Sequence, residues 1–148
     1  MHRIRGAAAA SVVAVVVLSA GVALAAPLSE SQWKKQANAL CKQVNKQLGP
    51  IQQEAFAGLG KDERPSAEQF SAYLEQAVPV IEDGVASIDA LNEPKSLKSG
   101  VKKFKVAVAD ALATIEADPA AVLSGNNDPF ARADKAARKI GLKACADG

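Results

Sequence analysis

Charged side chains are the main chemical resource of this 148-residue sequence, because it holds one histidine, His2, and two cysteines. His2 lies in an N-terminal segment that we expect to be removed on export. Without an imidazole the chain cannot build Ser-His or Cys-His nucleophilic sites, and it lacks the usual ligand of zinc, haem and copper. We therefore predict no catalytic residue, no metal ligand and no cofactor.

Two groups of basic residues could contact an anionic surface, such as a phosphate-bearing wall polymer or lipid headgroups. The interval 94–109 contains lysines and no acidic residue, and a second basic group lies nearer the C terminus. The alternative is that both are solvated helix faces, the second also favoured by the helix dipole. The candidate contact residues are Lys98, Lys102, Lys105, Arg138 and Lys139.

Acidic residues are the only remaining candidates for acid–base chemistry, which needs two groups in one cleft with displaced pKa values. Glu82 and Asp83 are adjacent, and neighbours on a helix diverge by about 100°, so they do not share a site. Asp128 is predicted to be a helix N-cap rather than a cation ligand with Asn126 and Asn127, because this loop lacks EF-hand spacing.

Three aromatic residues, Trp33, Tyr73 and Phe104, are candidates to line a pocket for an apolar ligand. Pro50 and Pro79 fall inside predicted helices, and kinks at these prolines could separate the helices enough to open such a pocket. The alternative is that the three aromatic side chains are ordinary core or boundary residues.

The elements that would position these residues are helices, because apolar residues recur every three or four positions beyond residue 27. Ser29 with Gln32, and Ser66 with Gln69, have the spacing of a capping box. A short helical turn is expected at 119–123. The predicted long helices span about residues 31–57, 66–91, 97–115 and 128–141.

Four helices joined by short loops alternate in direction, so we predict an all-α fold, an up-down-up-down four-helix bundle with proline-kinked helices. The composition agrees with this class, since 49% of residues are hydrophobic and the 4% of aromatic residues are too few for an all-β sandwich.

Residues 1–25 have the layout of a secretory signal peptide, with Arg3 and Arg5 at a basic start, an apolar run, and Ala-Leu-Ala at 23–25. We predict cleavage after Ala25, which leaves a secreted domain of residues 26–148 without an integral membrane span. The alternative is an uncleaved N-terminal anchor. Cleavage would leave 16 basic and 16 acidic residues, and without excess positive charge we expect no binding to nucleic acid.

The two cysteines, Cys41 and Cys145, are expected to form a disulfide, because an exported chain with an even cysteine count usually pairs them. Cys41 lies within the first predicted helix, and Cys145 lies just beyond the end of the fourth. In the predicted bundle both cysteines therefore come to a similar position along the bundle axis. The alternative is a redox-active or metal-binding thiol pair, which the absence of C-x-x-C spacing disfavours.

Two segments carry a resemblance to a group of proteins: Ala-Asn-Ala-Leu-Cys at 37–41 and Ile-Gly-Leu-Lys-Ala-Cys at 140–145. They resemble signatures of small exported all-helical proteins of high-GC Gram-positive bacteria, which include secreted proteins and lipoproteins. The resemblance implies a disulfide-tied helical bundle outside the cytoplasm and no defined activity. This chain lacks the cysteine that lipoproteins have at the cleavage site.

The function predicted from the sequence is that of an exported, non-catalytic protein that binds a partner protein, a cell-envelope component or a small apolar ligand. The alternative is a histidine-independent enzyme, such as a helical mutase or lyase, that uses carboxylates with arginine or lysine. Such an enzyme should hold Arg64, Arg132 or Arg138 beside an acid inside a concavity, whereas a binding protein should leave them on the outside.

Overall fold

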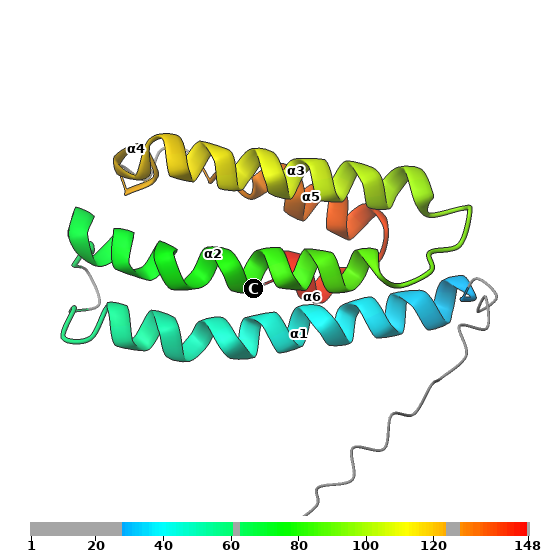
Figure 1. Ribbon diagram of the computed structural model, residues 1–148, viewed down its shortest axis with the longest axis horizontal. Helices are drawn as coiled ribbons and strands as arrows, with labels where there is room; N and C mark the ends of the chain where they lie inside the picture. Colours follow the sequence, from blue (N-terminus) through cyan, green and yellow to red (C-terminus); the bar gives the residue numbers. More distant parts are fainter. Residues whose placement is uncertain (1–27, 61–62, 124–127, 148) are drawn as a thin grey trace, which may run out of the picture.

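The computed structural model describes residues 28–60, 63–123 and 128–147, so the predicted signal segment with its cleavage site lies outside the described residues, as do Asn126 and Asn127. Every regular element in the described residues is a helix, which confirms the all-α prediction (Figure 1). The helices are α1 (Glu30–Ala55), α2 (Ala67–Asp89), α3 (Lys98–Ala117), α4 (Pro119–Leu123), α5 (Ala131–Lys139) and α6 (Lys143–Ala146).

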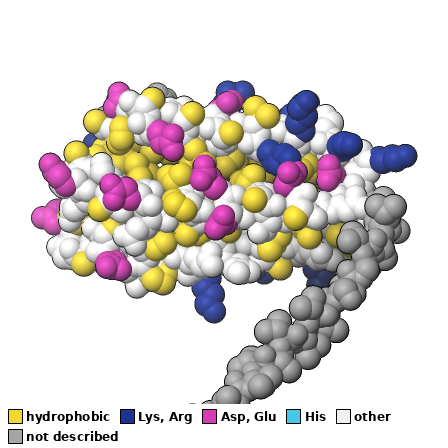
Figure 2. All heavy atoms as spheres, in the orientation of Figure 1, with side chains coloured by type: hydrophobic (Ala, Val, Ile, Leu, Met, Phe, Trp, Pro, Cys, Tyr) yellow, Lys and Arg dark blue, Asp and Glu magenta, His cyan; other side chains and the backbone are white. Residues whose placement is uncertain are grey.

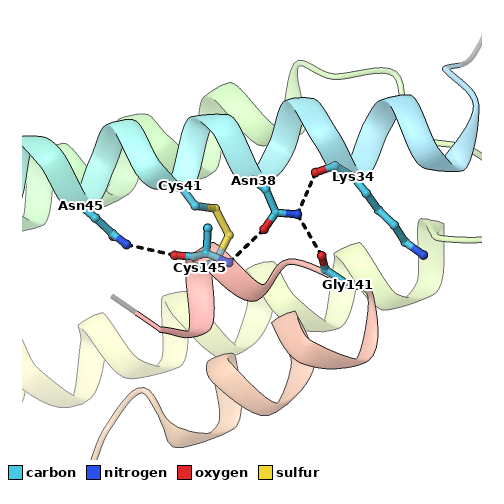
Figure 3. Close-up of a disulfide and its surroundings, with 7 residues drawn as sticks. Lys34, Asn38, Cys41, Asn45, Gly141 and Cys145 are labelled. Atoms are coloured by element: carbon cyan, nitrogen blue, oxygen red, sulfur yellow. Dashed lines mark hydrogen bonds between the residues drawn. A yellow bond between two sulfur atoms is a disulfide. The ribbon is translucent and has the colours of Figure 1, made fainter.

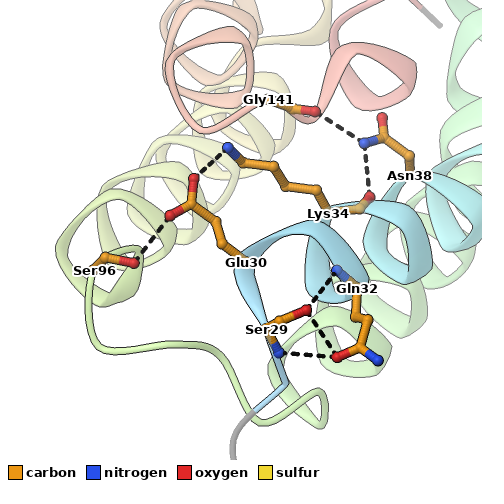
Figure 4. A network of polar contacts seen from close by, with 7 residues as sticks. All are labelled: Ser29, Glu30, Gln32, Lys34, Asn38, Ser96 and Gly141. Carbon is orange, nitrogen blue, oxygen red and sulfur yellow. Dashed lines mark hydrogen bonds and ion pairs between the residues drawn. The ribbon is translucent and has the colours of Figure 1, made fainter.

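Both predicted capping boxes are present and begin the two longest helices. The Ser29 hydroxyl accepts a hydrogen bond from the Gln32 backbone N–H, and the Gln32 side chain accepts one from the Ser29 N–H (Figure 4). Ser66 and Gln69 make the same pair of bonds before α2. Each box satisfies two N–H groups, one in the first turn of the helix and one on the capping residue itself.

A polar network beside the first capping box joins the start of α1 to the loop between α2 and α3 (Figure 4). Glu30 forms an ion pair with Lys34, one turn further along α1, and accepts a hydrogen bond from the Ser96 hydroxyl of that loop at 3.2 Å. The hydrogen bond from Lys34, followed by that from Ser96, lowers the pKa of the Glu30 carboxyl. Because the network is exposed, it adds little stability. Its effect is to hold the loop between α2 and α3 against the start of α1.

The two long helices continue through their prolines, since Pro50 lies within α1 and Pro79 within α2. A proline crowds the Cβ of the residue before it in a helix, and Gly49 has no Cβ. The sequence therefore tolerates Pro50 without ending α1. The helix stops at Ala55, and Gly58 follows with a φ of +86°, a conformation that glycine adopts without strain.

The long helices form two layers. Helix α1 packs against α2, α3 packs against α5, and α6 contacts both α5 and α1. In Figure 1 the α1–α2 pair lies below the α3–α5 pair, and the chain runs in opposite directions within each pair. Two glycines allow close approach: a Cβ at Gly84 would overlap Val44, and one at Gly100 would overlap Ile140. The first contact sets the α1–α2 distance and the second holds the end of α5 against α3.

The core is apolar throughout the described residues, and none of their polar or charged side chains is fully buried in it. Trp33 and Leu142 are its largest fully buried side chains. The indole N–H of Trp33 has no hydrogen-bond partner among the described residues. Helix α3 contributes the predicted apolar face, with Phe104 and Val108 each 5% exposed.

The C-terminal part differs from the sequence prediction. The predicted N-cap at Asp128 is wrong, because α5 begins at Ala131 with Phe130 in the cap position. The Asp128 carboxylate instead accepts a hydrogen bond from the Phe130 N–H at 2.9 Å and stabilises the preceding turn. Gly141, at a φ of +79°, ends the helix as expected. Helix α6 was not predicted, because four residues are too few to show a helical period.

Candidate functional site

A disulfide holds the C-terminal helix α6 against the middle of α1. Cys41 and Cys145 are bonded across 104 positions of sequence, which confirms the predicted pairing (Figure 3). A link of this span removes much of the conformational freedom of the unfolded chain. The disulfide therefore stabilises the folded arrangement, in which α6 contacts both α1 and α5.

Two asparagines strengthen this attachment from either side of Cys41 (Figure 3). Asn38 donates from Nδ2 to the Gly141 carbonyl at 2.9 Å, and its Oδ1 accepts from the Ala144 N–H at 2.9 Å. Asn45 donates to the Ala144 carbonyl at 3.0 Å. Positions 38, 41 and 45 share one face of a helix, so a single face of α1 makes all these contacts. The Ala-Asn-Ala-x-Cys segment at 37–41 includes Asn38, but the hydrogen bonds of Asn38 to the C-terminal segment were not predicted from the sequence.

A cavity of about 300 Å³ lies between the two layers, next to the disulfide. This is about twice the size of an apolar cavity that accepts benzene in an engineered protein, about 150 Å³. Figure 2 shows hydrophobic side chains along a hollow between the α2 and α3 sides of the molecule. The apolar side chains of the lining include Val44, Leu48, Ile81, Val85, Phe104 and Val108.

Two of the three predicted pocket aromatics, Tyr73 and Phe104, line this cavity, whereas Trp33 is fully buried in the core and does not. The Tyr73 ring lies 5.2 Å from the Phe56 ring and 6.3 Å from the Phe70 ring. Burial raises the pKa of the Tyr73 hydroxyl, which stays a neutral hydrogen-bonding group at neutral pH. Of this aromatic cluster only Tyr73 lines the cavity, to which it contributes an aromatic ring and a hydroxyl group.

The only charged residues in the lining of the cavity, as far as the chain is described, are Asp128 and Asp134. The Asp134 carboxylate makes no hydrogen bond or ion pair with another described residue. Burial raises the pKa of its carboxyl, the negative charges of Asp128 and Asp147 raise it further, and Arg138 lowers it. One part of a mostly apolar cavity, which Asn45 and Tyr73 also line, thus carries incompletely balanced negative charge.

None of the three arginines in the described part of the chain lines this cavity. Arg132 lies 3.6 Å from Asp110, with side chains 80% and 54% exposed, and Arg138 lies 3.4 Å from Asp147 on the surface. Arg64 donates to a backbone carbonyl at 3.2 Å. The arrangement of an arginine beside an acid inside the cavity, which the enzyme alternative requires, does not occur among the described residues.

The five residues predicted to contact an anionic surface do not form one surface in the structure. Lys102 and Lys139 line a groove of about 690 Å³ between α3 and α5. Lys105 forms an ion pair with Asp89 of α2 instead. The groove does not include the other two, Lys98 and Arg138. Sequence reasoning grouped these residues by proximity along the chain, whereas the packing of α3 on α5 selects those that share a surface.

No protein-family model matches this sequence, and comparison with curated proteins and with solved structures finds no significant similarity. Within the described ranges, no three His, Cys, Asp or Glu side chains gather in a way that could hold a metal ion. No helix in those ranges has both the length and the apolar composition required to cross a bilayer.

Proposed function

We propose that this protein is a secreted, non-catalytic binding protein that holds a small apolar ligand in the cavity between its two helical layers. The cavity is the observation that supports the proposal. Its volume of about 300 Å³ lies at the lower end of the range for small-molecule sites, which are mostly apolar with a few polar groups. Val85, Phe104 and Val108 supply apolar contact, and Tyr73 supplies a polar atom.

We also propose that the fold is an up-down-up-down four-helix bundle made by α1, α2, α3 and α5. The short helix α6 packs against α1 and α5 of this bundle. The alternation of chain direction in Figure 1 supports this description. Ligand sites in helical bundles form from side chains on facing helices. The disulfide supports an oxidising compartment and therefore export. The contact of α6 with the Asn38–Cys41 part of α1 supports the resemblance to small exported helical proteins.

The chemistry of the ligand follows from the charged part of the lining. No lysine or arginine is among the described lining residues, and Arg138 outside the lining offsets the charge of Asp134 only in part. A ligand with a positively charged group would therefore relieve the repulsion between Asp128 and Asp134. The apolar remainder of the lining fits a hydrocarbon or aromatic body. An amine with an apolar chain meets both requirements better than a carboxylate of the same length.

The histidine-independent enzyme is the less favoured candidate. This alternative pairs a carboxylate with an arginine or lysine, and among the described residues neither an arginine nor a lysine lines the cavity. The carboxylates of Asp128 and Asp134 can instead attract a cationic ligand. The exposed positions of Arg132 and Arg138 support the same conclusion.

The test is displacement of the neutral fluorescent probe N-phenyl-1-naphthylamine by decylamine, decanol and decanoate. We expect decylamine to displace the probe at the lowest concentration. Val85→Phe adds bulk to the cavity wall and should weaken binding of all four compounds by roughly tenfold or more. The matched control, Val106→Phe, enlarges a side chain that is 51% exposed outside the cavity and should leave binding unchanged.

Two outcomes contradict a ligand site in the cavity, and a third contradicts the assigned ligand charge. Equal binding by wild type and Val85→Phe would place the probe outside the cavity, and absence of probe binding would remove the ligand site. Stronger displacement by decanoate than by decylamine would keep the cavity but contradict the assigned ligand charge. Circular dichroism and the unfolding midpoint establish that the Val85→Phe protein is folded.

A further inference from the structure

The groove between α3 and α5 is separate from the cavity, and no described residue lines both. Its volume is about 690 Å³, and no acidic residue lines it among those described. All its charged side chains are basic and exposed. They are Lys102 and Lys103 from α3, and Arg132, Lys135 and Lys139 from α5.

Helix packing brings these residues together from parts of the sequence about thirty positions apart. The absence of a side chain at Gly100 lets Ile140 approach α3, so the two helices lie close along the groove. Basic residues three or four positions apart on α5 repeat once per turn, about every 5 Å along the helix. The groove therefore has positive charge on both walls.

Among the described residues, few acidic side chains neutralise this positive charge. Arg132 lies 3.6 Å from Asp110, and both side chains are largely exposed, so the ion pair is weak. Lys102, Lys135 and Lys139 make no ion pair with any described residue. The whole sequence has a net charge of only +2, so the groove is a local concentration of charge and not the average of the surface.

We propose that the α3–α5 groove binds a linear, phosphate-bearing polymer of the cell envelope. Cations on two facing walls can contact a polymer chain from both sides. A flat bilayer surface would contact only the outer edges of the groove. Four of the five cations are lysines, which act as point charges and lack the planar fork with which arginine reads the shape of a phosphate. The groove therefore fits a repeating charge and not one small anion.

A second observation argues against a membrane as the occupant. Val106 is the only large hydrophobic residue exposed in the described part of the chain, and it lines the groove. Helices that bind in the plane of a bilayer insert a continuous apolar face between the headgroups. A single valine does not provide such a face.

The experiment measures binding of long-chain inorganic polyphosphate to the purified protein at several salt concentrations. Lys102→Gln with Lys135→Gln removes one charge from each wall and should weaken binding roughly tenfold at low salt. The dependence of log affinity on log salt should become less steep by about one to two. The matched control, Lys42→Gln with Lys46→Gln, removes two exposed charges from α1 and should change affinity less than twofold.

Comparison probes identify the class of partner. Orthophosphate at the same phosphate concentration should not compete, because it occupies only one site along the groove. If the groove variant and the α1 control lose the same affinity for polyphosphate, net charge alone drives binding and the proposal is overturned. Binding to phosphatidylglycerol vesicles or to single-stranded DNA without binding to polyphosphate would overturn it as well. Val85→Phe should leave polyphosphate binding intact, so failure of the cavity proposal is distinguishable.

Discussion

Asn38→Ala is the substitution that most directly tests how the C-terminal segment is held. It removes hydrogen bonds to the carbonyls of Lys34 and Gly141, at 2.8 Å and 2.9 Å, and one from the Ala144 N–H at 2.9 Å. The Lys34 bond stays within one turn of α1, so the other two carry the attachment. A net contribution of about 1 kcal/mol each predicts a loss of about 2 kcal/mol in the free energy of unfolding.

Urea unfolding followed by tryptophan fluorescence is the assay, because Trp33 is the only tryptophan and is fully buried. For a chain of this size we expect the thermal midpoint to fall by roughly 6 °C. Asn45→Ala is the matched control on the same face of α1, and it loses one bond of 3.0 Å and about 1 kcal/mol.

Hydrogen exchange adds a readout specific to one bond. Asn38 accepts from the Ala144 N–H, whereas Asn45 bonds the Ala144 carbonyl, so only Asn38→Ala should speed exchange of the Ala144 amide. The account of the attachment is refuted if Asn38→Ala costs no more than Asn45→Ala and the Ala144 amide stays protected.

Three further predictions concern packing, the disulfide and pH. Gly84→Ala should lower the free energy of unfolding by about 1–2 kcal/mol in urea titrations, because its methyl group overlaps Val44; strict additivity with Val44→Ala would contradict this contact. Replacing Cys41 and Cys145 by alanine should cost about 4–5 kcal/mol by the same assay, and a cost below about 1 kcal/mol would contradict the loop-entropy argument. Because the pKa of Asp134 is raised above its ordinary 3.8, its ionisation as pH rises through the raised pKa weakens the fold. Asp134→Asn should therefore gain stability over wild type at pH 7 but not at pH 3.5, and an equal difference at both pH values would contradict the shift.

The elements most accurately predicted from sequence were those specified by local chemistry. Ser29 and Ser66 begin helices because their hydroxyls meet a backbone N–H three residues on, and that spacing is visible in the sequence. Gly141 ends α5 because glycine adopts a positive φ without strain. The disulfide was predictable because the chain offers only one pair of cysteines.

Features that depend on packing between distant segments were not predictable to the same degree. The sequence named Asn38 within a motif, but its partners lie 103 and 106 positions away, so its role needed the placement of α6. Lys102 and Lys105 belong to one lysine run, yet one lines the α3–α5 groove and the other pairs with Asp89. Likewise, no periodicity distinguishes Trp33 in the core from Tyr73 at the cavity.

Native mass spectrometry of the protein isolated from the medium of its own culture tests the central claim most directly. We predict that wild type and Val106→Phe carry a bound small molecule, that its mass is that of an apolar amine, and that Val85→Phe lacks it. A bare mass for wild type, or the same adduct on wild type and Val85→Phe, would contradict a ligand in the cavity between the two helical layers.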